Sequence, residues 1–375
     1  MIKPLAAGTA VVLLVLARLV SAQIPAAPEV GATSYALMDF HSGELLAQKD
    51  PALQVEPASI TKLMTSYVVF RELEAGRLAL DDIVRVSEKA WRMEGSRMFI
   101  EVGTEVSVED LLLGVIVQSG NDASVALAEH VAGSEAVFAQ MMNAEAERLG
   151  LSGTHYVNAT GLPHPDHYTT ALDVARLSRA LIGDFPEYYK WYSQREFTYN
   201  GITQNNRNLL LWRDPSVDGL KTGHTESAGY CLATSALRDG MRLISVVMGT
   251  ASENARAEAN QALLNFGFRF FETFRLYSAG EQIATVPVWK GQLDEMRLGI
   301  GSDVFVTVPR GRQDALAAEM QIPRQPVAPF SKGREFGELQ VLFDGEVRLT
   351  RPLVVLDDVP RAGWWGRMTD GIGLW

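Results

Sequence analysis

The chain has 375 residues, 47% of them hydrophobic, which is enough for one large domain and a smaller one, each with its own core. This composition excludes a largely disordered protein. The formal net charge of -11 at pH 7 disfavours nucleic acid as a partner, because an acidic surface repels phosphate backbones.

The first 22 residues have the pattern of a secretory signal peptide. Lys3 precedes an apolar stretch at residues 5–16, and the sequence VSA at residues 20–22 supplies the small residues of a cleavage site. We expect export and cleavage after Ala22, and losing the two positive charges of Lys3 and Arg18 would change the net charge from -11 to -13. Because Arg18 interrupts the apolar run before it reaches the roughly 20 residues of a membrane span, an uncleaved anchor is only the alternative.

The cysteine and histidine content predicts neither a disulfide nor a metal site. Cys231 is the only cysteine, and we expect it to be a small buried hydrophobic group in a strand. The histidines include no helical pair with metal-ligand spacing, although His164 and His167 share a loop. No metal and no cofactor is therefore expected.

Strands at both ends of a helical block predict the larger domain. Residues 33–50 alternate as two short strands around a turn at His41–Gly43, and residues 229–250 form a hairpin pattern that turns at Arg238–Gly240. Apolar residues at helical spacing occur in five segments, at residues 57–73, 107–117, 124–151, 170–183 and 255–271. This order indicates an antiparallel sheet flanked by helices, an α/β (α+β) fold.

The pattern changes near Gly280 to short alternating strands. A clear hairpin turns at Asp344–Gly345, which predicts a second, all-β domain. We therefore expect a signal peptide at residues 1–22, a larger α/β domain at 23–280, a β-rich domain at 281–359 and a tail at 360–375.

The tail has the spacing of a membrane-surface helix. Trp364, Met368, Ile372 and Trp375 would form one apolar stripe, although four glycines weaken helix formation. At 15 residues from Arg361 to its end, the tail is too short to span a bilayer, so we expect an interfacial amphipathic anchor. Docking of the tryptophans onto the β-rich domain is the alternative.

Ser59 and Lys62 stand three positions apart at the start of the first helical pattern. A serine hydroxyl needs a neighbouring base to act as a nucleophile, and a lysine can be that base only if its pKa is lowered. Residues at i and i+3 lie on one helix face, so the spacing suits catalysis. A solvated lysine is the alternative for this motif alone.

Two further motifs accompany this pair. Ser119-Gly120-Asn121 lies between two helical patterns, where its hydroxyl and amide can project into a cleft. Lys221-Thr222-Gly223 enters a strand, and Gly223 is small enough for a ligand to pass close to the backbone. Taken alone, the first of these motifs is compatible with an ordinary turn between helices, and the second is compatible with the edge of a strand.

Together, and in this order, the three motifs resemble those of the penicillin-binding proteins and serine β-lactamases. The S-G-N and K-T-G-H-T sequences are similar to those of the low-molecular-mass D-alanyl-D-alanine carboxypeptidases of the penicillin-binding protein 5/6 type. The exported N-terminus, residues 201–212, the β-rich domain and the tail extend this resemblance over nearly the whole chain. It implies a penicillin-binding-protein transpeptidase-like fold, a peptidoglycan pentapeptide as substrate, covalent inhibition by β-lactams, and a peripheral position on the periplasmic face of the inner membrane.

The resemblance also implies roles for individual residues. Ser59 would attack the carbonyl between the two terminal D-alanines and form an acyl-enzyme, with Lys62 as the general base. Lys221 would place a positive charge near Lys62, and Ser119 would pass a proton to the leaving D-alanine. Asn121 would bind the substrate amide and orient Lys62.

The remaining roles concern substrate binding. The backbone N–H groups of Ser59 and His224 would form the oxyanion hole, and Lys221, Thr222 and Arg207 would hold the free carboxylate of the substrate. Two other functions share parts of this sequence pattern. A β-lactamase would need rapid deacylation, but residues 157–173 contain no glutamate, and an exported non-catalytic wall-binding protein would not need the complete set of catalytic side chains.

Overall fold

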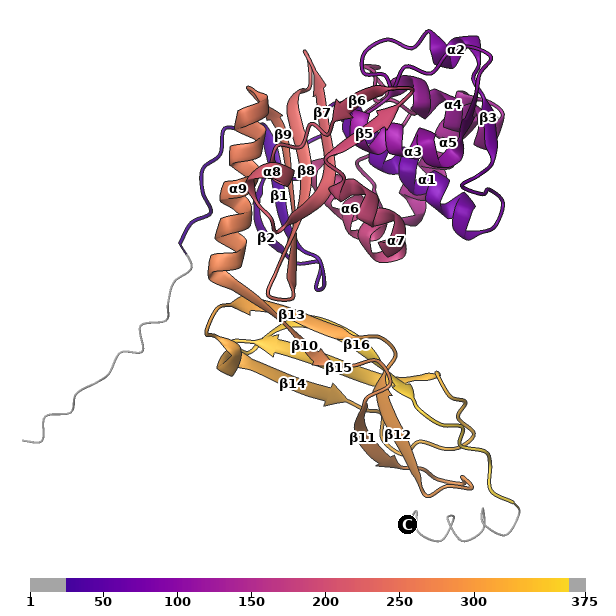
Figure 1. Cartoon of the computed structure of the whole chain (residues 1–375). Coiled ribbons are helices and arrows are strands. Elements are labelled where there is room, and N and C mark those ends of the chain that lie inside the picture. The colour runs from indigo at the N-terminus through magenta and orange to yellow at the C-terminus, as the bar shows by residue number, and fades with distance from the viewer. Residues whose placement is uncertain (1–24, 364–375) are drawn as a thin grey trace, which may run out of the picture.

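The computed structural model describes residues 25–363 and divides them between a larger α/β part and an elongated β-rich part (Figure 1). The larger part is built on a five-stranded antiparallel sheet with the strand order β2-β1-β9-β8-β7. Its strands are β1 (Ser34–Asp39), β2 (Leu45–Lys49), β7 (Val217–Thr225), β8 (Gly229–Arg238) and β9 (Met241–Thr250). The predicted antiparallel sheet is therefore confirmed.

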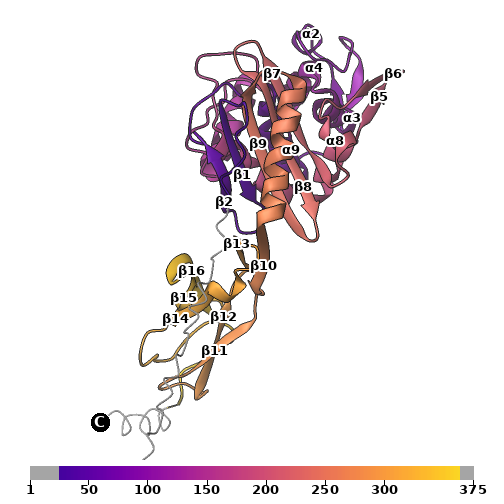
Figure 2. The ribbon, with the colours of Figure 1, turned by 90° about the vertical axis from the view of Figure 1, so that its left-hand side faces the viewer.

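Helices cover both faces of this sheet. One face packs against α9 (Glu253–Phe270), which runs along the strands as Figure 2 shows. The other face packs against α6 (Ala171–Asp184), which belongs to a group of helices between residues 62 and 189 that we call the helical lobe. Each face has its own apolar core, and the larger core lies between the sheet and the lobe. Burial on both faces explains why β8 and β9 are continuous runs of apolar and small residues.

The helical lobe contains four of the five segments that the apolar spacing predicted, and the fifth is α9 on the other face of the sheet. Ser107 caps α3 by accepting a hydrogen bond from Asp110 N, as the capping-box spacing indicated. Two small two-stranded sheets, β3-β4 and the hairpin β5-β6, accompany the lobe and were not predicted by the sequence analysis. The elements here are α1 (Lys62–Glu74), α2 (Glu88–Trp91), α3 (Val108–Leu113), α4 (Asn121–Ala132), α5 (Glu135–Arg148), α7 (Pro186–Tyr189), β3 (Ile83–Arg85), β4 (Glu105–Ser107), β5 (Glu196–Tyr199) and β6 (Ile202–Asn205). The short helix α8 (Leu210–Arg213) contributes instead to the core on the α9 side of the sheet.

The C-terminal part is all β, as predicted, and has its own apolar core. One sheet has the order β11-β12-β16-β15-β14, and β10 pairs with β13 in a second sheet. Its strands are β10 (Phe271–Tyr277), β11 (Gln282–Pro287), β12 (Glu295–Ile300), β13 (Val304–Pro309), β14 (Leu316–Gln321), β15 (Glu335–Phe343) and β16 (Glu346–Val355). Because β10 pairs with β13, we propose a boundary between the two parts at the end of α9, before the expected residue 280.

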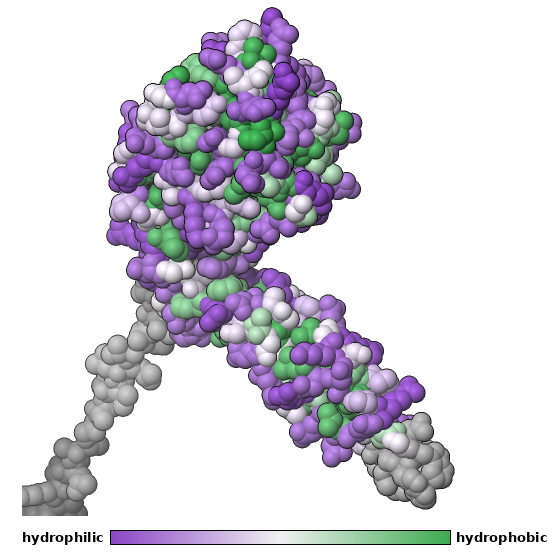
Figure 3. All heavy atoms as spheres, turned by 45° about the vertical axis from the view of Figure 1, so that its right-hand side comes forward, coloured by the Kyte–Doolittle hydropathy of each residue, from purple (hydrophilic) through white to green (hydrophobic). Residues whose placement is uncertain are grey.

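Polar side chains join the two parts. Asp39, at the end of β1, is fully buried, and its Oδ2 accepts a hydrogen bond of 2.8 Å from Thr273 Oγ1 on β10. The hydroxyls of Ser42 and Thr307 lie 2.7 Å apart across the same junction. The space-filling view shows the β-rich part extending from this junction at one end of the larger part (Figure 3).

The described chain ends against the β-rich part. Gln292 N donates to Pro360 O and Ala362 N donates to Lys290 O, both at 2.9 Å, so we propose that the tail begins after Gly363 instead of at residue 360. The predicted tryptophan stripe at residues 364–375 lies outside the described residues. Of the helices that the structure describes, none combines the length and the apolar character needed to cross a bilayer.

Candidate active site

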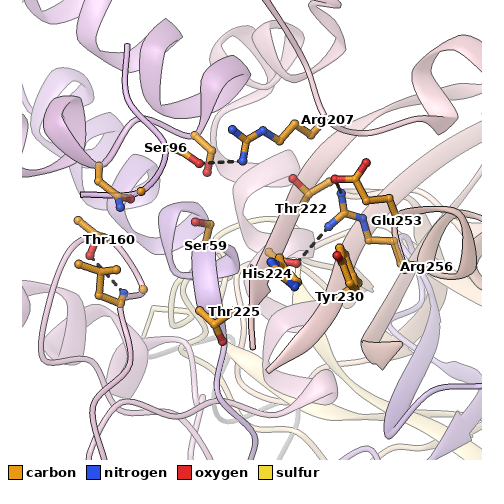
Figure 4. A pocket seen from close by; sticks show the side chains of 16 residues that line it. Ser59, Ser96, Thr160, Arg207, Thr222, His224, Thr225, Tyr230, Glu253 and Arg256 are labelled. Atoms are coloured by element: carbon orange, nitrogen blue, oxygen red, sulfur yellow. Dashed lines mark hydrogen bonds and ion pairs between the residues drawn. The ribbon is translucent and has the colours of Figure 1, made fainter. Parts of the chain in front are cut away.

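Ser59 lies in a tight turn immediately before α1. The turn is a 3-10 helix at Ala58–Thr61, whereas the sequence analysis expected Ser59 in the first turn of the α-helix itself. Ala58 adopts a left-handed backbone conformation with φ of 46°, and Ile60 N donates to Pro57 O. The Ser59 side chain is half-buried and faces a cleft (Figure 4).

Lys62 is the first residue of α1 and is completely buried. Its Nζ donates three hydrogen bonds, to Ser59 Oγ at 3.0 Å, to Asn121 Oδ1 at 2.7 Å and to Thr160 O at 2.7 Å. All three directions in which an ammonium group can donate are thus occupied by protein acceptors. The structure excludes the solvated-lysine interpretation.

The pKa of Lys62 is lowered from 10.5 to about 7. Burial is the largest cause, the positive charge of Arg207 is the next, and the carboxylate of Asp122 opposes both. The sequence analysis assigned the repelling charge to Lys221, but the pKa of buried Lys221 is itself held well below its usual value, by burial and then by Lys62. Lys62 can therefore be a neutral base near neutral pH.

A second serine and lysine pair lies beside the first. Ser119 ends a π-helical turn at Gly114–Gln118 and adopts a left-handed conformation with φ of 63°, which directs its hydroxyl toward β7. Lys221 Nζ donates to Ser119 Oγ at 2.9 Å and to Thr222 O at 3.1 Å. Both side chains are buried. The site thus contains two hydroxyls, each hydrogen-bonded to a buried amine.

Asn121 connects Lys62 to one wall of the cleft. Its Nδ2 donates to Glu94 O at 2.6 Å, while its backbone N donates to Ser96 O at 2.7 Å. The adjacent Asp122 is buried and accepts hydrogen bonds from the backbone N–H groups of residues 98–100. The S-G-N motif therefore holds the loop at residues 94–100 against the cleft.

The cleft has a volume of about 360 Å³ and lies between the helical lobe and β7 (Figure 4). The predicted residues that line it are Ser59, Ser119, Asn121, Arg207, Thr222, Gly223 and His224, and Lys62 and Lys221 lie directly behind their hydroxyl partners. All nine predicted positions are thus brought together. Arg207 and His224 are exposed, and Arg207 Nη1 donates to Ser96 Oγ at 2.7 Å.

The structure adds residues that the sequence analysis missed. Arg256 on α9 is buried, donates to Gly223 O at 3.2 Å and forms an ion pair of 3.5 Å with Glu253. Its Nη2 is nevertheless without a hydrogen-bond partner among the described residues. The rings of Tyr230 and His224 stack with centroids 3.9 Å apart. The sequence singled out neither Arg256 nor Tyr230, because no local motif marks them.

Gly223 allows β7 to approach the turn that carries Ser59. A Cβ at this position would lie 3.0 Å from Pro57 O and 3.1 Å from the Ile60 side chain. A larger residue would therefore separate β7 from the nucleophile. Within residues 25–363, no group of three or more His, Cys, Asp or Glu side chains is arranged to hold a metal ion.

This fold and this cleft define a class of protein, the serine acyl-transfer enzymes with the penicillin-binding-protein fold. The chain belongs to the D-alanyl-D-alanine carboxypeptidase family, whose profile matches residues 21–252. Residues 271–361 match the C-terminal domain of penicillin-binding protein 5. Members of the family act through an acyl-enzyme and are covalently inhibited by β-lactams, and the chain is accordingly a serine peptidase.

Individual relatives support the same assignment. The chain is 41% identical to D-alanyl-D-alanine carboxypeptidase DacA of Escherichia coli over 363 residues, which cover 95% of this chain and 90% of that protein. It is 42% identical to the protein of the same name from Haemophilus influenzae over 353 residues, 92% of this chain and 90% of that protein. The crystal structure of penicillin binding protein 5 from Haemophilus influenzae superposes with a TM-score of 0.85 at 42% identity, covering 89% of this chain and 99% of that one.

Proposed function

We propose that the protein removes the terminal D-alanine from peptidoglycan pentapeptides through an acyl-enzyme on Ser59. Lys62 takes the proton from the Ser59 hydroxyl as Oγ attacks the carbonyl carbon of the penultimate D-alanine. The observation that carries this proposal is the hydrogen bond of 3.0 Å between Lys62 Nζ and Ser59 Oγ, made by an amine whose pKa is lowered to about 7.

The second pair acts on the leaving group. When the tetrahedral intermediate breaks down, the nitrogen of the terminal D-alanine needs a proton. Ser119 Oγ supplies this proton and is supported by Lys221, whose Nζ lies 2.9 Å away. Asn121 accepts from Lys62 at 2.7 Å, which orients the base toward Ser59, and also binds the amide of the substrate.

Cationic and hydroxyl groups bind the free carboxylate of the substrate. Arg207 and Thr222 lie on the cleft wall, with Lys221 behind them, and their donors suit a carboxylate. We add Arg256, because its buried Nη2 has an ion pair of 3.5 Å with exposed Glu253 but no hydrogen-bond partner among the described residues, so it can donate to a ligand acceptor. This carboxylate requirement separates a trimming carboxypeptidase from a general protease.

Backbone N–H groups of Ser59 and His224 form the oxyanion hole in this proposal. Both residues line the cleft, on opposite sides of the close approach at Gly223. Preorganised N–H donors of this kind typically lower the barrier of acyl transfer by about 3 kcal/mol each.

Release of D-alanine from a purified pentapeptide tests this function. The wild-type protein should release one D-alanine per peptide, and Ser59→Ala should release none while its melting temperature stays close to that of the wild type. The same protein should hydrolyse benzylpenicillin slowly after a stoichiometric burst. Rapid steady-state hydrolysis without a burst would instead indicate a β-lactamase, and the absence of both reactions would leave a wall-binding protein.

We further propose export and attachment to the periplasmic face of the inner membrane. The apolar leader at residues 1–22 and the tryptophan-rich sequence at residues 364–375 support this location. The described chain ends at the end of the β-rich part that is far from the larger part (Figures 1 and 2). An anchor at this end would hold the catalytic cleft away from the lipid surface.

A further inference from the structure

His167 is a buried histidine that no step above uses. Its side chain is 2% exposed and lies behind the turn that carries Ser59. His167 Nδ1 accepts a hydrogen bond of 3.1 Å from Val157 N, and Nε2 lies 2.8 Å from Thr61 Oγ1. Both ring nitrogens therefore have protein partners.

These partners determine which ring nitrogen carries the proton. A backbone N–H can only donate, so Nδ1 must be without a proton to accept from Val157. The proton is therefore on Nε2, which donates to Thr61 Oγ1. Burial lowers the pKa of His167 to about 4, and the charges of His155, His164 and Lys62 act in the same direction. The ring is thus neutral at working pH.

The two hydrogen bonds of His167 join segments that position Lys62 and one of its acceptors. Thr61 directly precedes Lys62 in the chain, and Val157 begins the short segment that ends at Thr160, whose carbonyl accepts from Lys62 Nζ at 2.7 Å. Within this segment, Asn158 Oδ1 accepts from Thr160 N at 3.1 Å and from Gly161 N at 2.7 Å, which turns the Thr160 carbonyl toward the amine. One imidazole thus connects the start of α1 to the segment that completes the environment of Lys62.

We propose that neutral His167 is a positioning residue for acylation, which fixes Lys62 relative to the Thr160 carbonyl by bonding Thr61 and Val157 at once. This inference rests on the proposed role of Lys62. Protonation of His167 would place a hydrogen on Nδ1, opposite the Val157 N–H, and would add a charge close to Lys62. The groups facing the ring are the basic side chains of Lys62, His155 and His164 and the edge of Tyr156, whose hydroxyl stays protonated because burial raises its pKa.

Two substitutions separate the hydrogen bonds of His167 from its volume. His167→Phe keeps a ring but cannot accept from Val157 or donate to Thr61. His167→Gln keeps one acceptor and one donor. The second-order rate constant of acylation by benzylpenicillin should fall about tenfold or more in His167→Phe and stay within about threefold of wild type in His167→Gln, because small displacements of a catalytic base are costly. Equal rates in His167→Phe and wild type, or equal losses in both variants, would overturn the proposal.

Thr61 provides an independent test from the other end of the hydrogen bond. Thr61→Val keeps the shape but removes the hydroxyl, and Thr61→Ser keeps the hydroxyl. The effects of Thr61→Val and His167→Phe on acylation should be less than additive, because both remove the same contact. Full additivity would show that the two residues act separately. If His167→Phe does not fold, the test rests on Thr61: Thr61→Val should acylate more slowly than Thr61→Ser, and equal rates in these two variants would overturn the proposal.

The pH profile distinguishes positioning from a purely structural role. In the wild type, the acylation rate should fall about tenfold per pH unit below the Lys62 pKa of about 7, and about a hundredfold per unit below about pH 4, where His167 also takes up a proton. His167→Gln should keep the shallower slope throughout. A steep acid limb in both proteins contradicts the proposal, whereas a wild-type protein that benzylpenicillin does not acylate rejects the proposed function itself.

Discussion

At the scale of single residues, burial converts Lys62 from a cation into a base. A lysine in the unfolded chain titrates near 10.5, and the folded protein lowers this pKa to about 7. Between these values the unfolded state binds more protons than the folded state, so the Lys62 contribution to the free energy of unfolding increases as the pH rises from about 7 to about 10.5. Below pH 7 this contribution is constant and at its minimum. The protein thus gives up stability at neutral pH to keep a reactive amine.

We predict that Lys62→Arg lowers acylation by benzylpenicillin by about 10²–10⁴-fold, the range of a lost general base, because a guanidinium keeps its proton at any usable pH. Rapid-quench kinetics measure this rate. Lys89→Arg is the matched control, because Lys89 is 52% exposed and pairs with Glu135 away from the cleft, and it should acylate like the wild type. A Lys62→Arg rate within a few-fold of wild type would remove Lys62 as the base.

Arg207→Ala should lower D-alanine release from the pentapeptide by about 10–100-fold, because a charge-assisted hydrogen bond to the substrate carboxylate is lost. Because Arg207 is exposed, the melting temperature of the Arg207→Ala variant should stay close to that of the wild type. Arg213→Ala, an exposed arginine on α8 that bonds Asn254, serves as the control. If the wild-type enzyme cleaves a pentapeptide with an amidated C-terminus as fast as the free acid, the carboxylate clamp is misassigned.

At the scale of elements, the sequence predicted the helices and the sheet better than the environment of the site. Apolar spacing located α1 and α6, and Ser107 and Ser252 cap α3 and α9 through local hydrogen bonds that the sequence can encode. The burial of Lys62 depends instead on Asn121 and Thr160, 59 and 98 positions away in the chain. No local pattern carries such contacts, and for the same reason Arg256 and Tyr230 were not predicted.

Gly161 shows how closely two elements approach at the site. It has a φ of +85°, and a Cβ there would lie 1.8 Å from Ala58 O, inside the turn that carries Ser59. We predict that Gly161→Ala destabilises the protein by about 1–3 kcal/mol more than Gly76→Ala, because overpacking adds to backbone strain. Gly76 has a similar φ of +66° but no atom within 4 Å of its added Cβ.

Thermal unfolding and acylation kinetics check this prediction together. Gly161→Ala should also acylate more slowly, since displacing Ala58 displaces Ser59, while Gly76→Ala should acylate normally. Equal melting temperatures and equal rates in the two variants would show that the contact with Ala58 is unimportant.

At the scale of the whole molecule, the larger part and the β-rich part meet at a junction that includes buried Asp39. The β-rich part extends from this junction away from the larger part (Figure 1). The catalytic cleft belongs entirely to the larger part. The β-rich part therefore acts as a spacer in the proposed arrangement, with the tail at its far end. Removing the tail should affect location and not chemistry.

We predict that a protein ending at Gly363 keeps full activity on a soluble pentapeptide but no longer sediments with anionic vesicles. Gly363 is the appropriate end point because Arg361 Nε and Ala362 N still donate to Ala328 O and Lys290 O of the β-rich part. Binding of the mature protein, from residue 23 onward, should be modest, since the net charge of -13 expected after loss of Lys3 and Arg18 opposes an anionic surface. Equal sedimentation of the complete and the shortened protein would reject the anchor.

Mass spectrometry of the protein after reaction with benzylpenicillin tests the acyl-enzyme on Ser59 most directly. The wild type should gain the mass of one penicilloyl group, and digestion should place it on Ser59 within residues 57–65. Ser59→Ala should gain nothing while keeping its melting temperature. An adduct of the same stoichiometry on Ser59→Ala, or one that maps to Ser119 in the wild type, would contradict the mechanism.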